Sequence, residues 1–78
     1  MSSKYPVLPP KRIIKVMRKF GFYKISQKGS HAKYKNNETE KIFIIPMYSE
    51  IARGTLESIL EQADIEIEEF LKIYNQLF

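Results

Sequence analysis

The sequence predicts an α+β fold in which one helix precedes a three-stranded antiparallel sheet and two helices follow it. Apolar residues recur at helical spacing near the start of the chain and again beyond residue 53. Between these segments lie three short runs rich in aromatic and β-branched residues, separated by residues that favour turns. With 78 residues, the chain is expected to form one small domain spanning 1–78.

The first predicted helix begins directly after a proline-rich lead. Pro6, Pro9 and Pro10 oppose a helix over residues 1–9 but suit one that starts at residue 10. Its apolar residues are Ile13, Ile14, Val16, Met17 and Phe20, and its cations are Lys11, Arg12, Lys15, Arg18 and Lys19. Gly21 is expected to end it in the left-handed conformation. We expect the cations to add long-range attraction for an anionic partner without forming a site.

Three strands are predicted next. They are expected at residues 22–27, 31–35 and 41–45, with turns at 28–30 and 36–39 and with Pro46 at the end of the third strand. Because side chains alternate along a strand, His31 shares one face of the sheet with Lys33 and Lys35. Ala32 and Tyr34 point to the other face.

Two more helices follow a loop at residues 47–53. The second helix runs from Gly54 to Ala63, with an apolar stripe of Leu56, Ile59, Leu60 and Ala63. Asp64 interrupts the pattern, and a third helix is expected at about residues 66–77 with a stripe of Ile67, Phe70, Leu71, Tyr74, Leu77 and Phe78. This last stripe either covers the small core or forms the seam of a dimer or a partner complex.

The charges are divided unevenly along the chain. Residues 1–37 contain ten Lys or Arg and no acid, whereas residues 38–78 contain three Lys or Arg against nine acids. A basic half without opposing carboxylates is typical of proteins that bind nucleic acid. The alternative is that these charges form ordinary solvated faces.

The segment Lys28-Gly29-Ser30-His31-Ala32-Lys33-Tyr34-Lys35 combines the only histidine with a glycine turn and three lysines. Histidine is the side chain whose ordinary pKa, roughly 6.5, allows proton exchange near neutral pH. Neighbouring cations favour its neutral, proton-accepting form. We therefore predict that single-stranded or messenger RNA is bound and cut here, with His31 as the catalytic residue.

Cleavage of RNA without a metal needs a base, an acid and positive charge near the transition state. His31 can act as the base or as the acid. The remaining predicted site residues are Lys28, Gly29, Ser30, Lys33 and Lys35, which supply positive charge or orient a phosphate oxygen. The second proton-transfer group is open among a lysine, Tyr34, Tyr48, water and His31 itself. The competing hypothesis is a non-catalytic module that binds RNA or a protein.

Composition excludes several classes of site. There is no cysteine and only one histidine, so neither a disulfide nor a cysteine- or histidine-rich metal site is expected. No apolar run is long enough for a signal peptide or a membrane span. We expect a cytoplasmic protein that needs no cofactor.

The chain resembles the HicA toxins, also called the YcfA-like family. The features that carry the resemblance are the Phe20-Gly21-Phe22 helix end, the Gln27-Lys28-Gly29-Ser30-His31 turn, Tyr34, Ile44-Ile45-Pro46, the segment Glu50-Ile51-Ala52-Arg53-Gly54-Thr55-Leu56, and Ile59 to Ala63. Together they span about residues 11–65, so the family core is expected at about 10–65, with the third helix as an addition.

The resemblance implies the α-β-β-β-α fold of double-stranded-RNA-binding domains. It also implies an mRNA interferase activity with the active histidine at His31, and a HicB-type antitoxin that binds the toxin and masks its site. Many relatives carry further histidines where this chain has Ala32 and Tyr48. A mechanism that depends on two histidines is therefore not possible here.

Overall fold

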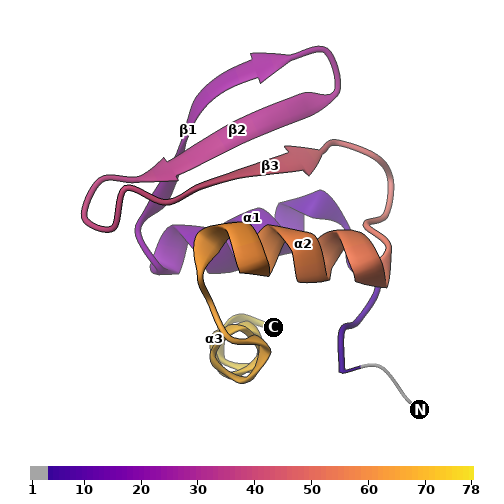
Figure 1. Cartoon of the computed structure of the whole chain (residues 1–78). Coiled ribbons are helices and arrows are strands. Elements are labelled where there is room, and N and C mark those ends of the chain that lie inside the picture. Colours follow the sequence, from indigo (N-terminus) through magenta and orange to yellow (C-terminus); the bar gives the residue numbers. More distant parts are fainter. Residues whose placement is uncertain (1–3) are drawn as a thin grey trace.

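The computed structural model describes residues 4–78 and has the predicted order of elements (Figure 1). The elements are α1 (Pro10–Lys19), β1 (Phe22–Lys28), β2 (His31–Asn36), β3 (Ile42–Pro46), α2 (Arg53–Ala63) and α3 (Ile67–Leu77). The α+β prediction, with three antiparallel strands and an additional C-terminal helix, is confirmed. Residues 1–3 of the proline-rich lead lie outside the described residues.

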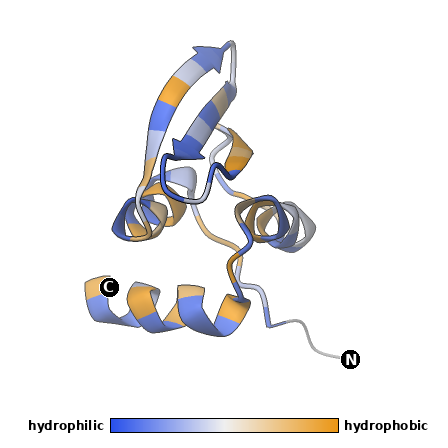
Figure 2. Cartoon of the chain, turned by 60° about the vertical axis from the view of Figure 1, so that its left-hand side comes forward, coloured by the Kyte–Doolittle hydropathy of each residue, from blue (hydrophilic) through white to orange (hydrophobic). Residues whose placement is uncertain are grey.

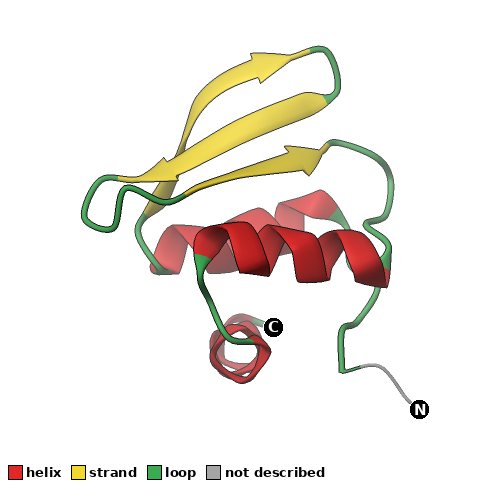
Figure 3. Ribbon diagram, viewed as in Figure 1, coloured by secondary structure: helices red, strands yellow, loops and turns green. Residues whose placement is uncertain are grey.

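The molecule consists of three layers (Figures 1 and 3). The sheet has the order β1-β2-β3, and α1 and α2 lie side by side beneath one of its faces. α3 crosses below these two helices and packs against α1. No helix within residues 4–78 covers the other face of the sheet, which we call the open face (Figure 3).

The ends of the helices follow from local sequence. Pro10 occupies the first turn of α1, where its missing N–H is not needed. The helix ends at Phe20, and Gly21 then takes a φ of +98°, as predicted for a left-handed residue after a helix. At the end of α2, Asp64 adopts a φ of +59°, a conformation that Asp tolerates better than most residues.

A bulge in β1 sets the direction of its side chains. Lys24 pairs with Tyr34, and Ser26 pairs with Lys33, so Ile25 is the extra residue between them. Residues four apart on a regular strand share a face. Because of the bulge, Lys24 instead lies on the helix-facing side, while Lys28 pairs with His31 on the open face.

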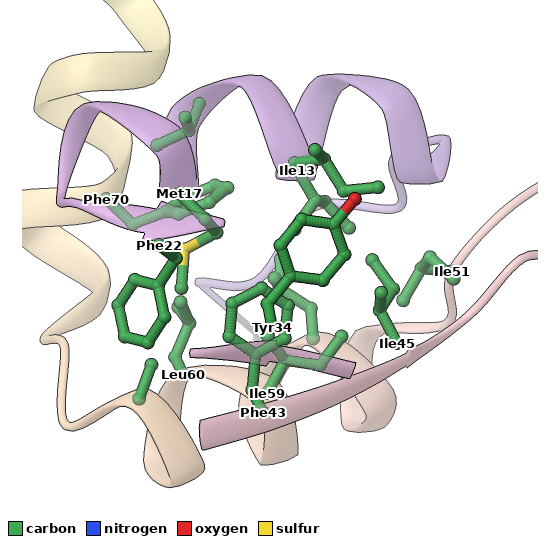
Figure 4. Close-up of a cluster of buried hydrophobic side chains, with 14 of the residues drawn as sticks. Ile13, Met17, Phe22, Tyr34, Phe43, Ile45, Ile51, Ile59, Leu60 and Phe70 are labelled. Carbon is green, nitrogen blue, oxygen red and sulfur yellow. The ribbon is translucent and has the colours of Figure 1, made fainter. Parts of the chain in front are cut away.

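The core lies between the sheet and the first two helices (Figure 4). Phe43 of β3 is fully buried, with its ring centroid 5.1 Å from that of Phe22 and 5.2 Å from that of Tyr34. Figure 4 shows these rings among aliphatic side chains from α1 and α2. The core therefore joins all three strands to both helices.

The apolar stripe of α3 covers this core from below. Phe70 is fully buried and Ile67 nearly so, and Figure 2 shows the hydrophobic residues of α3 on the side toward the other helices. Arg12 of α1 donates a 2.8 Å hydrogen bond to the Tyr74 hydroxyl, and its guanidinium lies 4.8 Å from the Phe78 ring centroid. The stripe is thus used within the chain, and nothing in these contacts supports the dimer considered as its alternative.

Candidate nucleic-acid interface

His31 is the first residue of β2 and is exposed on the open face. Its partners across the sheet are Lys28 on β1 and Pro46 on β3. Directly opposed residues in an antiparallel pair have Cβ atoms about 5 Å apart, so Lys28 is the cation directly opposite His31 in the sheet. The row through His31 contains no carboxylate.

Two further rows complete the open face, and they combine cations with apolar side chains. They are Ser26-Lys33-Ile44 and Tyr23-Lys35-Ile42. Ile44 is 42% exposed and Ile42 is 39% exposed, so two large apolar side chains of β3 contact solvent on this face. The face therefore offers contact area as well as charge.

The turn before His31 is held in place on two sides. Gly29 has a φ of +61° and Ser30 does not have a positive φ, the pattern of a two-residue hairpin turn with glycine at its first central position. The Gln27 side-chain amide donates a 3.1 Å hydrogen bond to the Gly29 carbonyl. From the other side, the Met47 N–H donates a 2.6 Å hydrogen bond to the Ser30 carbonyl.

That second bond brings the loop after β3 next to the histidine. The ring of Tyr48 lies edge-on to the imidazole, with 6.4 Å between centroids and 76° between planes. Tyr48 is 56% exposed, so it is accessible to solvent beside His31. The loop is anchored again where the Ile51 N–H donates a 2.8 Å hydrogen bond to the Leu8 carbonyl.

Tyr34 does not lie at this site. It is only 4% exposed, stacks on Phe43 with 3° between ring planes, and points to the helix-facing side of β2. Its hydroxyl therefore faces away from the open face, and we remove it from the candidates for the second proton transfer. The alternation along β2 already places Tyr34 on the face opposite His31, and the structure shows that helices cover that face.

The five predicted binding residues are not equivalent. Gly29 and Ser30 form the turn, and Lys28 directly precedes it. Lys33 is exposed on β2, two residues after His31. Lys35 lies at the far end of the strand, where its ammonium forms a 3.4 Å ion pair with Glu40. We expect Lys35 to contribute less to anion binding than Lys28 or Lys33, because a carboxylate already offsets part of its charge.

A comparison with known families identifies the family of this chain. A family model described as HicA toxin of bacterial toxin-antitoxin matches residues 10–65. This range covers more than half of the 78 residues. The chain belongs to the HicA toxin family. No curated protein matches the sequence.

The match places this HicA toxin in a two-component system that includes an antitoxin. The matched range begins at the first residue of α1 and ends at Ile65, just after α2. The open face and His31 lie inside it, whereas α3 lies outside it. Within residues 4–78, no helix is long and apolar enough to cross a membrane.

Sequence reasoning missed the structural role of Asn36 in this HicA toxin. The sequence predicts a place for it in a polar turn, but it ends β2 and is 4% exposed. Its amide nitrogen donates a 2.7 Å hydrogen bond to the Phe20 carbonyl at the end of α1. Asn36 thus joins the strand that carries His31 to the first helix. An Asn between a strand and a turn is common enough in sequences that nothing local distinguishes it.

Proposed function

We propose that this HicA-family toxin is an endoribonuclease that cuts single-stranded or messenger RNA on the open face of its sheet. The observation that carries the proposal is the position of His31. His31 is exposed on a face of the sheet that no helix within residues 4–78 covers. Lys28 pairs with it from β1, and Lys33 lies two residues further along β2. Membership of the HicA toxin family supports an activity directed at RNA.

In the proposed reaction, a base removes the proton from a ribose 2′-hydroxyl, and the 2′-oxygen attacks the adjacent phosphorus. The bond from phosphorus to the 5′-oxygen breaks, an acid protonates that oxygen, and a 2′,3′-cyclic phosphate forms. His31 transfers one of these two protons. Lys28 and Lys33 stabilise the added negative charge on the phosphate oxygens. The candidates for the other transfer are a lysine such as Lys28, Tyr48, water and His31 itself.

A HicB-type antitoxin is the proposed protein partner. The exposed apolar side chains Tyr23, Ile42, Ile44 and Tyr48 share the open face with His31 or border it. Apolar side chains gathered on one face indicate a surface that becomes covered. An antitoxin that covers them also blocks access of RNA to the imidazole.

The proposal is tested by incubating the purified chain with RNA in the presence of a chelator. We expect cleavage that leaves cyclic-phosphate ends, and we expect His31→Ala to abolish cleavage while folding and RNA binding stay nearly unchanged. The matched control is Tyr23→Ala, an exposed ring on the same face but two rows from His31. Normal cleavage by His31→Ala would remove His31 from the mechanism.

Binding without cleavage by the native chain would instead identify a non-catalytic RNA-binding module. The lysines test the binding surface separately. Replacing Lys33 by Gln is expected to weaken binding to all RNA sequences alike, and to lower the slope of log K against log salt by about 0.7 for each phosphate that is no longer neutralised. Binding that does not respond to salt would contradict a role of the open face in holding phosphates.

A further inference from the structure

A second cationic feature lies on the side of the molecule away from His31. It is an open groove of about 380 Å³ between α1 and the helix-facing side of β2, lined by Lys11, Ile14, Lys15, Arg18 and Tyr34. This volume is within the range of roughly 300–1,000 Å³ that is typical of ligand sites. Three of the five lining residues are cations and none is an acid.

The spacing of the cations along α1 brings them together. Lys11, Lys15 and Arg18 are separated by four and three residues, so they line up along one side of the helix. All three are exposed, and within residues 4–78 no carboxylate forms an ion pair with them. The Lys15 ammonium lies 5.5 Å from the Phe78 ring centroid, so the end of the chain borders this cation. Cations held this close repel one another unless an anion joins them.

Tyr34 provides a second and independent observation. Its side chain is almost fully buried, and Figure 4 shows the ring reaching from β2 toward α1 with the hydroxyl at its far end. No residue within 4–78 forms a hydrogen bond with this hydroxyl. Since no enclosed side-chain oxygen or nitrogen in that range lacks a partner, the hydroxyl reaches solvent, and it does so in the groove that it lines.

We propose that this groove binds a phosphate group of the RNA backbone at a distance from the linkage that is cut. A phenol hydroxyl donates to phosphate oxygens, and Lys and Arg neutralise them. The inference rests on the proposed function, because it assigns the groove to the same RNA. From the sequence, these cations are expected only to attract an anionic partner at long range. The sequence does not show that Tyr34 lines the same groove as these cations.

Because of the bulge at Ile25, β1 carries lysines toward both the open face and the groove. The bulge places Lys28 beside His31 on the open face and Lys24 opposite Tyr34 on the groove side. His31 and Tyr34 are three residues apart on β2, roughly 10 Å at 3.3 Å per residue. An RNA strand must cover this distance and also pass around the edge of the sheet at β1, so it extends beyond the cut before it reaches the groove.

The test compares binding of non-cleavable 2′-O-methyl RNA of about twelve and about four nucleotides by fluorescence anisotropy. For the longer RNA, Arg18→Gln is expected to reduce affinity about threefold to tenfold and to lower the salt slope by about 0.7. Tyr34→Phe, which keeps the ring and its stack on Phe43, is expected to reduce affinity about threefold. The shorter RNA is expected to bind all variants equally. The matched control is Lys19→Gln, which removes one charge from α1 outside the groove.

Equal affinities of Arg18→Gln and Lys19→Gln for the longer RNA would overturn the inference, and so would an unchanged affinity of Tyr34→Phe. If inorganic phosphate shifts the NMR signals of the Tyr34 ring but the longer RNA does not, the groove takes a free anion and the assignment to the RNA backbone is wrong. Circular dichroism confirms that each variant is folded. Failure of the native chain to bind any RNA would instead overturn the proposed function itself.

Discussion

The junction between α1 and the sheet depends on one buried amide, and removing it is expected to destabilise the whole chain. Asn36 donates a 2.7 Å hydrogen bond to the Phe20 carbonyl and accepts bonds of 2.8 and 3.2 Å from the N–H groups of Glu38 and Thr39. A Cβ added at Gly21 would lie 3.0 Å from the Asn36 amide nitrogen, so the junction is tightly packed. Asn36→Ala removes all three bonds and leaves a space beside the glycine.

The size of the loss in stability depends on whether the groups that lose their hydrogen bond to Asn36 are buried or exposed. Each hydrogen bond contributes roughly 0.5–1.5 kcal/mol net, and a buried group left without a partner costs more than an exposed one. Glu38 and Thr39 are exposed, so their N–H groups regain water, whereas the Phe20 carbonyl belongs to a half-buried residue at the helix end. We expect a loss of about 2 kcal/mol in the free energy of unfolding. For a chain of this size, that corresponds to a fall in Tm of roughly 8–16 °C.

Thermal and urea unfolding followed by circular dichroism measure this loss. Asn37→Ala is the matched control, because Asn37 is exposed and forms no side-chain hydrogen bond within residues 4–78. We expect the control to change stability by less than about 0.5 kcal/mol. If Asn36→Ala were as stable as Asn37→Ala, the amide would not hold the helix to the sheet, and the reasoning would fail.

Two further predictions concern α3. Phe70 is fully buried and stacks near Tyr74, so Phe70→Ala is expected to lower the free energy of unfolding by about 3–5 kcal/mol in urea titrations; a loss below about 1 kcal/mol would show that α3 folds separately from the core. Lys4 and Glu68 form a 2.9 Å ion pair, and their mutual hydrogen bond lowers the pKa of Glu68 and raises the pKa of Lys4. The pair therefore stabilises the fold at pH values between the ordinary glutamate pKa and the ordinary lysine pKa. This contribution is lost when the pH falls through the lowered pKa of Glu68, and also when it rises through the raised pKa of Lys4. Glu68→Gln is expected to be less stable than Glu69→Gln at pH 7, and this difference is expected to shrink as the pH falls below the ordinary glutamate pKa. A difference that did not shrink on acidification would contradict this assignment.

The order of the helices and strands could be predicted because each element leaves a local signal. The apolar spacing in α1, the aromatic and β-branched runs of the strands and the left-handed position at Gly21 all depend on neighbouring residues. The same is true of the alternation in β2, where His31 and Lys33 are exposed and Ala32 and Tyr34 are buried as expected.

The candidate site was only partly predictable. His31 and its neighbouring cations belong to one continuous segment, so the sequence alone brings them together. Tyr48 approaches His31 because the Met47 N–H bonds to the Ser30 carbonyl, a contact between a loop and a turn that share no pattern. The partial neutralisation of Lys35 by Glu40 likewise depends on how the reversal after β2 folds back.

The sequence of this HicA toxin determines which side chains share one face of a helix or strand, because that depends only on their spacing along the chain. It thereby established the α+β order, the amphipathic helices and the exposure of His31 and Lys33 on the same face of β2. Contacts between distant residues depend on register and packing angle, which no local pattern specifies. The bulge that separates Lys24 from Lys28, the burial of Asn36 and the opening of Tyr34 into a cationic groove emerged only once the layers were assembled.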